Sequence, residues 1–431
     1  MKRKAVFFTL LVLPALVFAS GGGQQQAFGG GAGGGYLRFA WWGNTTRDER
    51  TVKVSQLFIE KNPGVMVETE PTAWDGYWAK LNTQAAAGSL PDVMQQDYMY
   101  IAQYNNRNQL VDMNAYVQSG LIDLSKWADS AVAAGRLDGK LVALSLGTNA
   151  WGIGVDPEVL KQAEITIDDT TWTWQDFEQY ALTIYQKTGV QTMPPNEFHQ
   201  LFEHTVRQYG KPYFAKDSKS LGWTDSPAII KDFIDVFLRL KAAGALFNPE
   251  EGFLLNLAIE EEPISRGKTW NAYYWSNQHI GHLNAAKRPL DYLICPSVNG
   301  NKAPFGTYLK PSQFISMLAS SRNKDLAAKF VNFILNDLEA NRILLAERGI
   351  PVPTSVREDL GPRVDPNMKY LFDYITRVTP FTSPIDPPDP AVSGEVRDVI
   401  RPLLLQALTG QLSSDAAVAQ MIQAANTVLT R

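Results

Sequence analysis

Short apolar runs alternate with amphipathic runs near the start of the chain, and this alternation constrains the fold more than any other feature. The apolar runs predict strands at Tyr36–Trp42, Val65–Thr69 and Val93–Gln95. The first helix between them should begin at the capping box Thr46-x-x-Glu49, and the second should cover Trp74–Ala87. Repeated strand–helix units imply a mostly parallel sheet with helices on both faces, so we predict an α/β fold.

Length and later sequence signals indicate two domains. A chain of 431 residues is too long for one ordinary hydrophobic core, and 45% of its residues are hydrophobic. The Asp138-Gly139 turn predicts a hairpin, and Asp156-Pro157 and Thr173 predict helix starts. Further helices are expected at 227–241, 324–335, 392–408 and 413–429, and a buried strand at 290–294.

The N-terminus has the pattern of an export signal. Three basic residues precede the apolar run Ala5–Phe18, and Val17-Phe18-Ala19 is a small-residue cleavage site, so residues 1–19 are predicted to be a signal peptide. The alternative is a membrane anchor, but the apolar run is shorter than the roughly 20 residues that a span needs. Residues 20–35 are rich in glycine and predict a flexible tether.

Composition excludes several classes of function. The formal net charge is −4, and the chain lacks the basic stripe that nucleic-acid binding needs. Cys295 is the only cysteine, so no intrachain disulfide can form. The glycines at 29, 31 and 34 precede the first predicted strand and therefore do not form a dinucleotide fingerprint.

The segment from Trp74 to Tyr104 carries a recognisable set of motifs. It contains W-D-x-x-x-x-K-L, then A-A-G-x-x-P-D-V, then an acidic and aromatic patch, and Val111-Asp112 follows shortly after. With Trp41-Trp42-Gly43 before it, this segment resembles the extracellular solute-binding proteins (family 1) of carbohydrate ABC transporters. Arg47 and Thr51 add a resemblance to the oligogalacturonide-binding subgroup. The resemblance implies a two-lobed periplasmic-binding-protein fold that binds a carbohydrate between its lobes, and an oligosaccharide is the expected ligand.

The resemblance also implies where the chain crosses between lobes. Lobe one would comprise residues 36–146 and 307–350, and lobe two residues 147–306 and 351–431. The crossings would lie at Ser145–Asn149, at Gly306 and at Gly349–Pro353, and together they would form a hinge. The implied partners are a carbohydrate ligand and the ABC permease subunits in the inner membrane. Ser20 stands where lipoproteins of the family carry cysteine, so we expect a soluble, monomeric periplasmic protein without a lipid anchor.

A sugar site should combine aromatic faces with polar side chains that hold hydroxyl groups. Strand ends, crossings and the divergent segment after Arg266-Gly267-Lys268 supply such residues. The predicted ligand-binding residues are Trp41, Trp42, Arg47, Trp74, Asp75, Asp97, Tyr98, Asn149, Trp151, Trp270, Asn271, Trp275, Gly306 and Tyr308.

Some of these residues have an alternative structural role. Trp41 and Trp42 are adjacent on a strand and face opposite ways, so at most one should reach the ligand while the other packs in the core. Asp97 could cap a helix instead, and Arg47 could be a solvated charge in a first helical turn. If Arg47 is free, its guanidinium would suit a uronate carboxylate.

Catalysis has little support in the sequence. The histidine pairs 199/204 and 279/282 do not form metal motifs, and no nucleophile elbow or Walker sequence is present. We therefore expect neither a catalytic residue nor a metal or other cofactor. The alternatives are a secreted glycoside hydrolase, with Asp75 and Asp97 as its carboxylate pair, and the same fold binding a peptide or a polyol phosphate.

Overall fold

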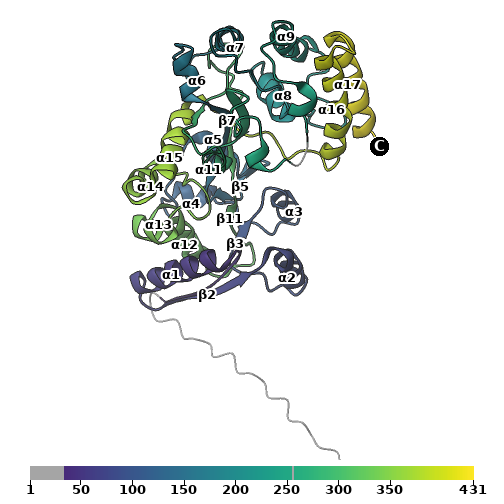
Figure 1. Ribbon diagram of the computed structural model, residues 1–431. Coiled ribbons are helices and arrows are strands. Elements are labelled where there is room, and N and C mark those ends of the chain that lie inside the picture. The colour runs from purple at the N-terminus through teal and green to yellow at the C-terminus, as the bar shows by residue number, and fades with distance from the viewer. Residues whose placement is uncertain (1–33, 255–256) are drawn as a thin grey trace, which may run out of the picture.

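The computed structural model describes residues 34–254 and 257–431 (Figure 1). The predicted signal peptide and almost all of the tether lie outside these residues. Two sheets form the framework, and the chain is α/β as predicted. No described helix has the length and apolar character needed to cross a membrane.

The first sheet has the strand order β2-β1-β3-β11-β6. Its strands are β1 Gly35–Trp42, β2 Val65–Thr72, β3 Val93–Gln96, β6 Leu144–Ser145 and β11 Phe314–Met317. The first three are parallel, as the strand–helix pattern predicts, and β11 joins them antiparallel from much later in the chain. The parallel strands therefore direct their carboxyl ends to one edge of the sheet.

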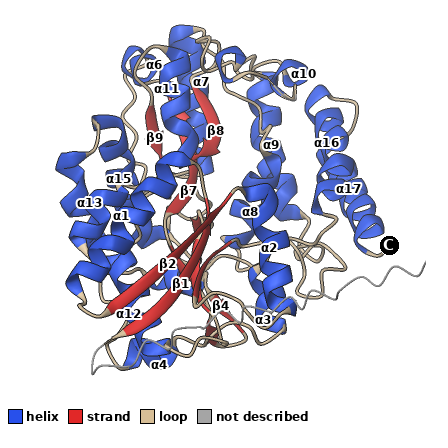
Figure 2. Cartoon of the chain, turned by 90° about the horizontal axis from the view of Figure 1, so that it is seen from below, coloured by secondary structure: helices blue, strands red, loops and turns tan. Residues whose placement is uncertain are grey.

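Helices flank the first sheet on both sides (Figure 2). They are α1 Thr45–Lys61, α2 Trp74–Ala86, α3 Ile101–Asn106, α4 Asn114–Gln118, α5 Asp129–Ala133, α12 Lys324–Asn336, α13 Leu338–Leu344 and α14 Thr354–Leu360. The predicted capping box at Thr46 is wrong. Asn44, in extended conformation, accepts a hydrogen bond from Arg47 N, so α1 starts earlier and Thr46 lies inside its first turn. The Asp138-Gly139 hairpin is confirmed, as β4 Arg136–Leu137 and β5 Lys140–Leu141.

The second sheet is built around one long strand. β7 Thr148–Val155 pairs antiparallel with β8 Asn271–Trp275, β9 Asp291–Leu293 and β10 Leu309–Pro311. Its helices are α6 Pro157–Gln162, α7 Trp174–Thr188, α8 Phe198–Arg207, α9 Ala228–Ala242, α10 Pro249–Gly252, α11 His279–Ala286, α15 Pro366–Val378, α16 Ser393–Thr409 and α17 Ser414–Leu429. The predicted caps at Asp156 and Thr173 are confirmed.

Three crossings between the sheets lie side by side. Leu146 N donates to Gln313 O at 2.8 Å, Ser312 N to Gly147 O at 2.9 Å, and Thr148 N to Ile350 O at 2.8 Å. Because β10 still belongs to the second sheet, the return crossing lies at Ser312-Gln313 and not at Gly306. We propose that the two sheets are the cores of two lobes joined by these crossings.

Aromatic side chains fill both cores. Phe39, Phe58 and Phe330 pack edge to face beside the first sheet, with ring centroids 5.0 to 5.3 Å apart. In the second, Trp174 and Phe233 pack edge to face at 4.9 Å beneath α9. The two C-terminal helices α16 and α17 pack together and against α9, at one end of the molecule (Figure 1). Both lobes are thus closely packed around their sheets.

Candidate functional site

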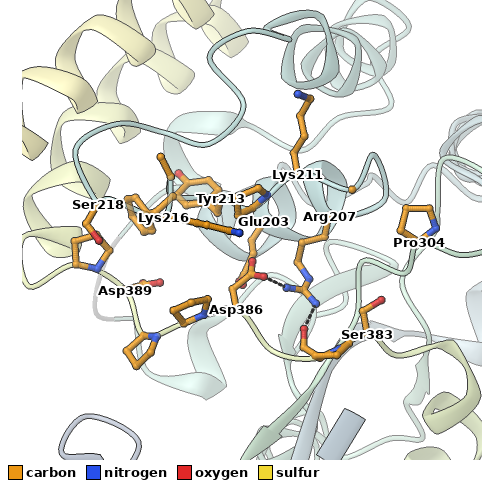
Figure 3. A pocket seen from close by; sticks show the side chains of 18 of the residues that line it. Glu203, Arg207, Lys211, Tyr213, Lys216, Ser218, Pro304, Ser383, Asp386 and Asp389 are labelled. Carbon is orange, nitrogen blue, oxygen red and sulfur yellow. Dashed lines mark hydrogen bonds and ion pairs between the residues drawn. The ribbon is translucent and has the colours of Figure 1, made fainter. Parts of the chain in front are cut away.

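A cavity of about 590 Å³ lies beside the second sheet (Figure 3). Its walls are the C-terminal half of α8, the loop that follows it, and an extended segment, Ser383–Pro390, which we call the strap. Half of the strap residues are prolines, which fix φ and lack an N–H, so the strap runs without helix or sheet pairing. Glu203 and Arg207 project from adjacent turns of α8 into this region (Figure 3).

Arg207 is the most strongly bound charge at the cavity. Its guanidinium forms an ion pair with the Asp386 carboxylate at 2.6 Å and donates to Pro384 O at 2.7 Å and Gly306 O at 3.0 Å. The Arg207 side chain is only 4% exposed. Charge-assisted hydrogen bonds of this kind are strong and directional, so Arg207 holds the strap against α8.

Glu203 presents a second carboxyl group to the cavity. Tyr308 Oη donates to Glu203 Oε2 at 3.1 Å. Burial raises the pKa of Glu203 to about 8, and the neighbouring Arg207 opposes this only in part. The Glu203 carboxyl is therefore mostly protonated at neutral pH and can both donate and accept a hydrogen bond.

Aromatic rings continue from Tyr308 along the second sheet. Trp275 lies 5.8 Å from Tyr308 and 5.4 Å from Trp151, edge to face in both pairs, and the Lys310 ammonium lies 4.6 Å from the Trp275 ring centre. The strand register explains the contact between Trp275 and Trp151, because Trp151 on β7 is directly opposite Trp275 on β8. A smaller cavity of about 290 Å³ borders Trp151 and Trp275.

Some buried polar atoms around these cavities have no partner within the described chain. They are Tyr213 Oη and Asp386 Oδ2 at the larger cavity, and Trp151 Nε1 at the smaller one. A buried donor or acceptor without a partner costs about 1–3 kcal/mol. A hydroxyl-bearing solute would offset that cost.

A second aromatic group lies on the first lobe. Trp42, Trp74 and Trp78 pack together, with Trp78 stacked on Tyr100 at 4.0 Å. Trp74 is 42% exposed and so offers part of its ring to solvent. Tyr98 extends from the end of β3 and donates to Asp386 O at 2.5 Å, which connects this side of the first lobe to the strap.

Three predicted residues lie in the core. Trp41 is buried and donates its indole N–H to Asp48 at 2.7 Å, while the Trp42 side chain lies on the opposite face of β1. Trp270 is buried and donates to Thr192 Oγ1, and Asn271 accepts from the main chain of Met193. None of the three lines either cavity, so we leave them out of the proposed site.

The other predicted residues occupy varied positions. Arg47 binds the Glu347 carboxylate at 2.8 and 3.1 Å, and Asp97 accepts from Met99 N within its own turn. Asn149 accepts from Ser276 Oγ at 3.4 Å. Gly306 accepts from Arg207 and lies so close to α8 that a Cβ there would approach His204 O to 2.2 Å. Asp75 lies in the first turn of α2, and its side chain is outside the part of the structure that is described.

Sequence reasoning missed the charged residues of the larger cavity. These are Glu203, Arg207, Lys211, Lys216, Asp386 and Asp389. Two signals were available: an acid and a base four residues apart on one predicted helix face, and the strap sequence S-P-I-D-P-P-D-P. Neither signal reveals that the two segments meet, because about 180 residues separate them along the chain.

The histidines have local partners. His199 Nε2 lies 3.3 Å from the Asp389 carboxylate, and His282 Nε2 lies 3.0 Å from Glu262. His204 Nε2 lies 3.0 Å from Pro296 O, and burial lowers the pKa of His204 to about 4. Among the described residues, no group of three or more His, Cys, Asp or Glu side chains has the arrangement of a metal site.

Two α/β sheets joined by three adjacent crossings, with aromatic and carboxyl groups around a cavity, define the class of solute-binding proteins. The chain belongs to the family of bacterial extracellular solute-binding proteins, whose sequence model matches residues 53–369. The resemblance drawn from the motifs is thereby confirmed.

Solved structures of the same fold cover nearly the whole chain. An extracellular solute-binding protein of family 1 from Alicyclobacillus acidocaldarius subsp. acidocaldarius DSM 446 is 25% identical, with a TM-score of 0.84 over 93% of this chain and 100% of that one. A periplasmic oligogalacturonide binding protein from Yersinia enterocolitica is 18% identical, with a TM-score of 0.74 over 92% and 99%. A cyclic α-maltosyl-1,6-maltose binding protein from Arthrobacter globiformis is 18% identical, with a TM-score of 0.66 over 92% and 100%.

Proposed function

We propose that this protein is the exported carbohydrate-binding component of an ABC importer, which binds an oligosaccharide between its lobes and delivers it to permease subunits in the inner membrane. The observation that carries the proposal is the row Trp151, Trp275 and Tyr308, which leads to the Glu203 carboxyl at the larger cavity. Sugars present apolar C–H faces and hydroxyl edges, and this row offers ring faces next to hydrogen-bonding groups. The names of the two sugar-binding structural neighbours are consistent with this ligand class.

The energetics favour a ligand rich in hydroxyl groups. Each aromatic contact should contribute about 0.5–1.5 kcal/mol beyond the burial of area. Hydroxyls could also partner Tyr213 Oη, Asp386 Oδ2 and Trp151 Nε1, the buried atoms that lack a partner within the described chain. Two cavities beside one aromatic row support a ligand of more than one sugar ring.

The charges support a neutral sugar over a uronate. A uronate carboxylate would need a free guanidinium, yet Arg47 is bound to Glu347 and Arg207 to Asp386. The wall of the larger cavity carries Asp386 and Asp389 together with Lys211 and Lys216, while Glu203 is mostly protonated at neutral pH. The preference for a neutral sugar therefore rests on the two guanidinium groups, which are already bound to carboxylates.

Binding would act through the equilibrium between lobe positions. Contacts that a sugar makes with both lobes exist only when the lobes are close, so the ligand stabilises the closed form. The permease would then distinguish loaded from empty protein by the position of the lobes. No catalytic step is required for this role.

Isothermal titration calorimetry tests the ligand class. We expect neutral oligosaccharides to bind, and digalacturonate and peptides to bind weakly or not at all. Binding of a peptide in the absence of binding by any sugar would contradict the carbohydrate proposal. The same samples are then analysed chromatographically, because Glu203 has the raised pKa that a glycosidase uses in its general acid. Steady product formation would favour hydrolysis over binding.

A further inference from the structure

The strap, Ser383–Pro390, is fixed to the second lobe at both ends. At its start, Ser383 N donates to Thr307 O at 3.0 Å, and Phe305 N donates to Ser383 Oγ at 3.2 Å. At its end, the Asp389 carboxylate lies 3.3 Å from His199 and 3.8 Å from Arg397. Between these points, Arg207 on α8 holds Asp386 and Pro384.

The same segment also contacts the first lobe. Tyr98 donates to Asp386 O at 2.5 Å, and the Ile385 side chain packs against the apolar cluster that includes Trp42 and Phe314. Immediately before the strap, Thr382 Oγ1 and Ser130 Oγ are 2.8 Å apart. The strap region is therefore a link between the lobes that is separate from the three crossings.

The strap also forms one wall of the larger cavity. Pro384, Asp386 and the residues from 387 to 390 line it, opposite Glu203 and Tyr213 (Figure 3). Asp386 thus has three roles at once. Its Oδ1 binds Arg207, its main-chain oxygen binds Tyr98, and its buried Oδ2 has no partner among the described residues. Because Asp386 Oδ2 is buried while the strap is in place, a solute can bond it only after the strap has moved.

We infer that the strap is a latch that holds the lobes together over the larger cavity, with Arg207 as the residue that positions it. Release of Asp386 from Arg207 or from Tyr98 frees the strap and so widens the larger cavity, whose lining residues all belong to the second lobe. A solute that then donates a hydrogen bond to Asp386 Oδ2 allows the strap to return to its place. The latch therefore favours solutes that fit beneath the strap. The inference relies on the proposed function for the chemistry of the solute, but the latch itself is a property of the empty protein.

The latch is tested by interlobe distances in the ligand-free protein. Cysteines introduced at the exposed positions Lys53 on α1 and Asp232 on α9 would carry spin labels, while the only native cysteine, Cys295, is buried. Pulsed dipolar spectroscopy then compares Tyr98→Phe and Asp386→Asn with the parent. We expect longer or broader distance distributions in both variants. We expect the double variant to change the distances by less than the sum of the single changes, because both contacts pass through Asp386.

Asp225→Asn is the matched control. It removes an ion pair with Lys211 beside the same cavity but within the second lobe, so the interlobe distances should stay as in the parent. Asp386→Asn leaves Arg207 without its carboxylate, so we expect it to lower stability. Tyr98→Phe loses only a hydroxyl group and should fold. Its interlobe distances therefore decide the test even if Asp386→Asn does not fold. A folded Tyr98→Phe protein with the distances of the parent would overturn the latch.

Solute entry gives the second readout. Stopped-flow tryptophan fluorescence with maltotriose should show a several-fold faster association in Tyr98→Phe than in the parent, because the open form is more populated. An unchanged association rate would contradict the gating role. If neither maltotriose nor any other sugar binds, the proposed function fails, whereas the latch is still decided by the distances in the empty protein.

Discussion

A carboxyl group that remains protonated at neutral pH is an uncommon part of a cavity wall, and Glu203 is such a group. Its pKa is raised from 4.5 to about 8 by burial, and Tyr308 donates its one hydroxyl proton to the carboxyl. In the unfolded chain the pKa returns to its ordinary value. Unfolding therefore releases a proton at any pH between the two values, so this group makes stability fall as pH rises.

Replacing Glu203 by glutamine should flatten the pH dependence of stability. The stabilisation linked to Glu203 is fully present below about pH 4.5 and is lost as pH rises through about 8. We expect the midpoint of thermal unfolding to fall less between pH 5 and pH 8.5 in Glu203→Gln than in the parent. Glu358→Gln, at an exposed position on α14, serves as control and should follow the parent. Parallel curves for all three proteins would contradict the raised pKa.

Trp275 is the aromatic residue whose loss should affect sugar binding most. It is half-buried, lines the smaller cavity, and contacts Trp151, Lys310 and the Tyr308 ring whose hydroxyl bonds Glu203 at the larger cavity. We expect Trp275→Ala to weaken the binding of a neutral oligosaccharide at least tenfold in calorimetry, with the circular dichroism spectrum retained. Tyr36→Ala, an exposed ring near the start of β1, should leave affinity unchanged. Unchanged affinity in folded Trp275→Ala would remove Trp275 from the site.

Individual residues differ in how far the sequence could predict their position. Alternation along β1 indicates that at most one of Trp41 and Trp42 reaches the ligand, but it does not say which one. Both are buried in the structure: Trp41 bonds Asp48, and Trp42 packs on the opposite face of the sheet against Trp74 and Trp78. The sequence suggests that Arg47 is a free charge, because its partner, Glu347, lies 300 residues away along the chain. Local patterns contain no information about such long-range ion pairs.

Elements with strong local signals were predictable. The helix cap at Thr173, the Asp138-Gly139 hairpin and the parallel strands β1 to β3 each depend on neighbouring residues, and each is confirmed. The return crossing was misplaced because β10 and β11 are short and their partners lie far back in the chain. Strand pairing between distant segments depends on the whole fold, so the sequence around Gly306 could not reveal it.

Gly147 should tolerate no side chain at the first crossing. A Cβ there would lie 2.5 Å from Arg348 O and 2.8 Å from Ser312 Oγ, which belong to the other two crossings. The main chain would have to shift, so we expect Gly147→Ala to lower the free energy of unfolding by about 1–3 kcal/mol. Chemical denaturation measures this change. Gly361→Ala, where the added Cβ meets nothing closer than 4.0 Å, should stay within about 0.5 kcal/mol of the parent.

The whole molecule is two lobes that meet at the crossings and again at the strap. A solute bound between the lobes adds contacts that exist only in the folded, closed chain. Binding should therefore stabilise the protein against unfolding and reduce the distance between the lobes. Both effects belong to the molecule as a unit, because the two cavities lie in the second lobe while the aromatic group of Trp42, Trp74 and Trp78 lies on the first.

A saturating neutral oligosaccharide should raise the midpoint of thermal unfolding. At a free ligand concentration one hundred times Kd, the stabilisation is about 2.7 kcal/mol. Differential scanning calorimetry over a series of ligand concentrations measures the rise and should give the Kd found by titration. Digalacturonate at the same concentration should shift the midpoint by much less. An equal shift with both ligands would contradict the preference for a neutral sugar.

The three crossings are also bonded to one another through their main chains, which makes them a single narrow ribbon. Such a ribbon bends easily across its width but resists stretching and sideways slip, because slip would break several main-chain hydrogen bonds together. The lobes should consequently move along one angular coordinate. A larger solute would then be accommodated by a wider closing angle, so the angle between the lobes would report the size of the bound solute as well as its presence.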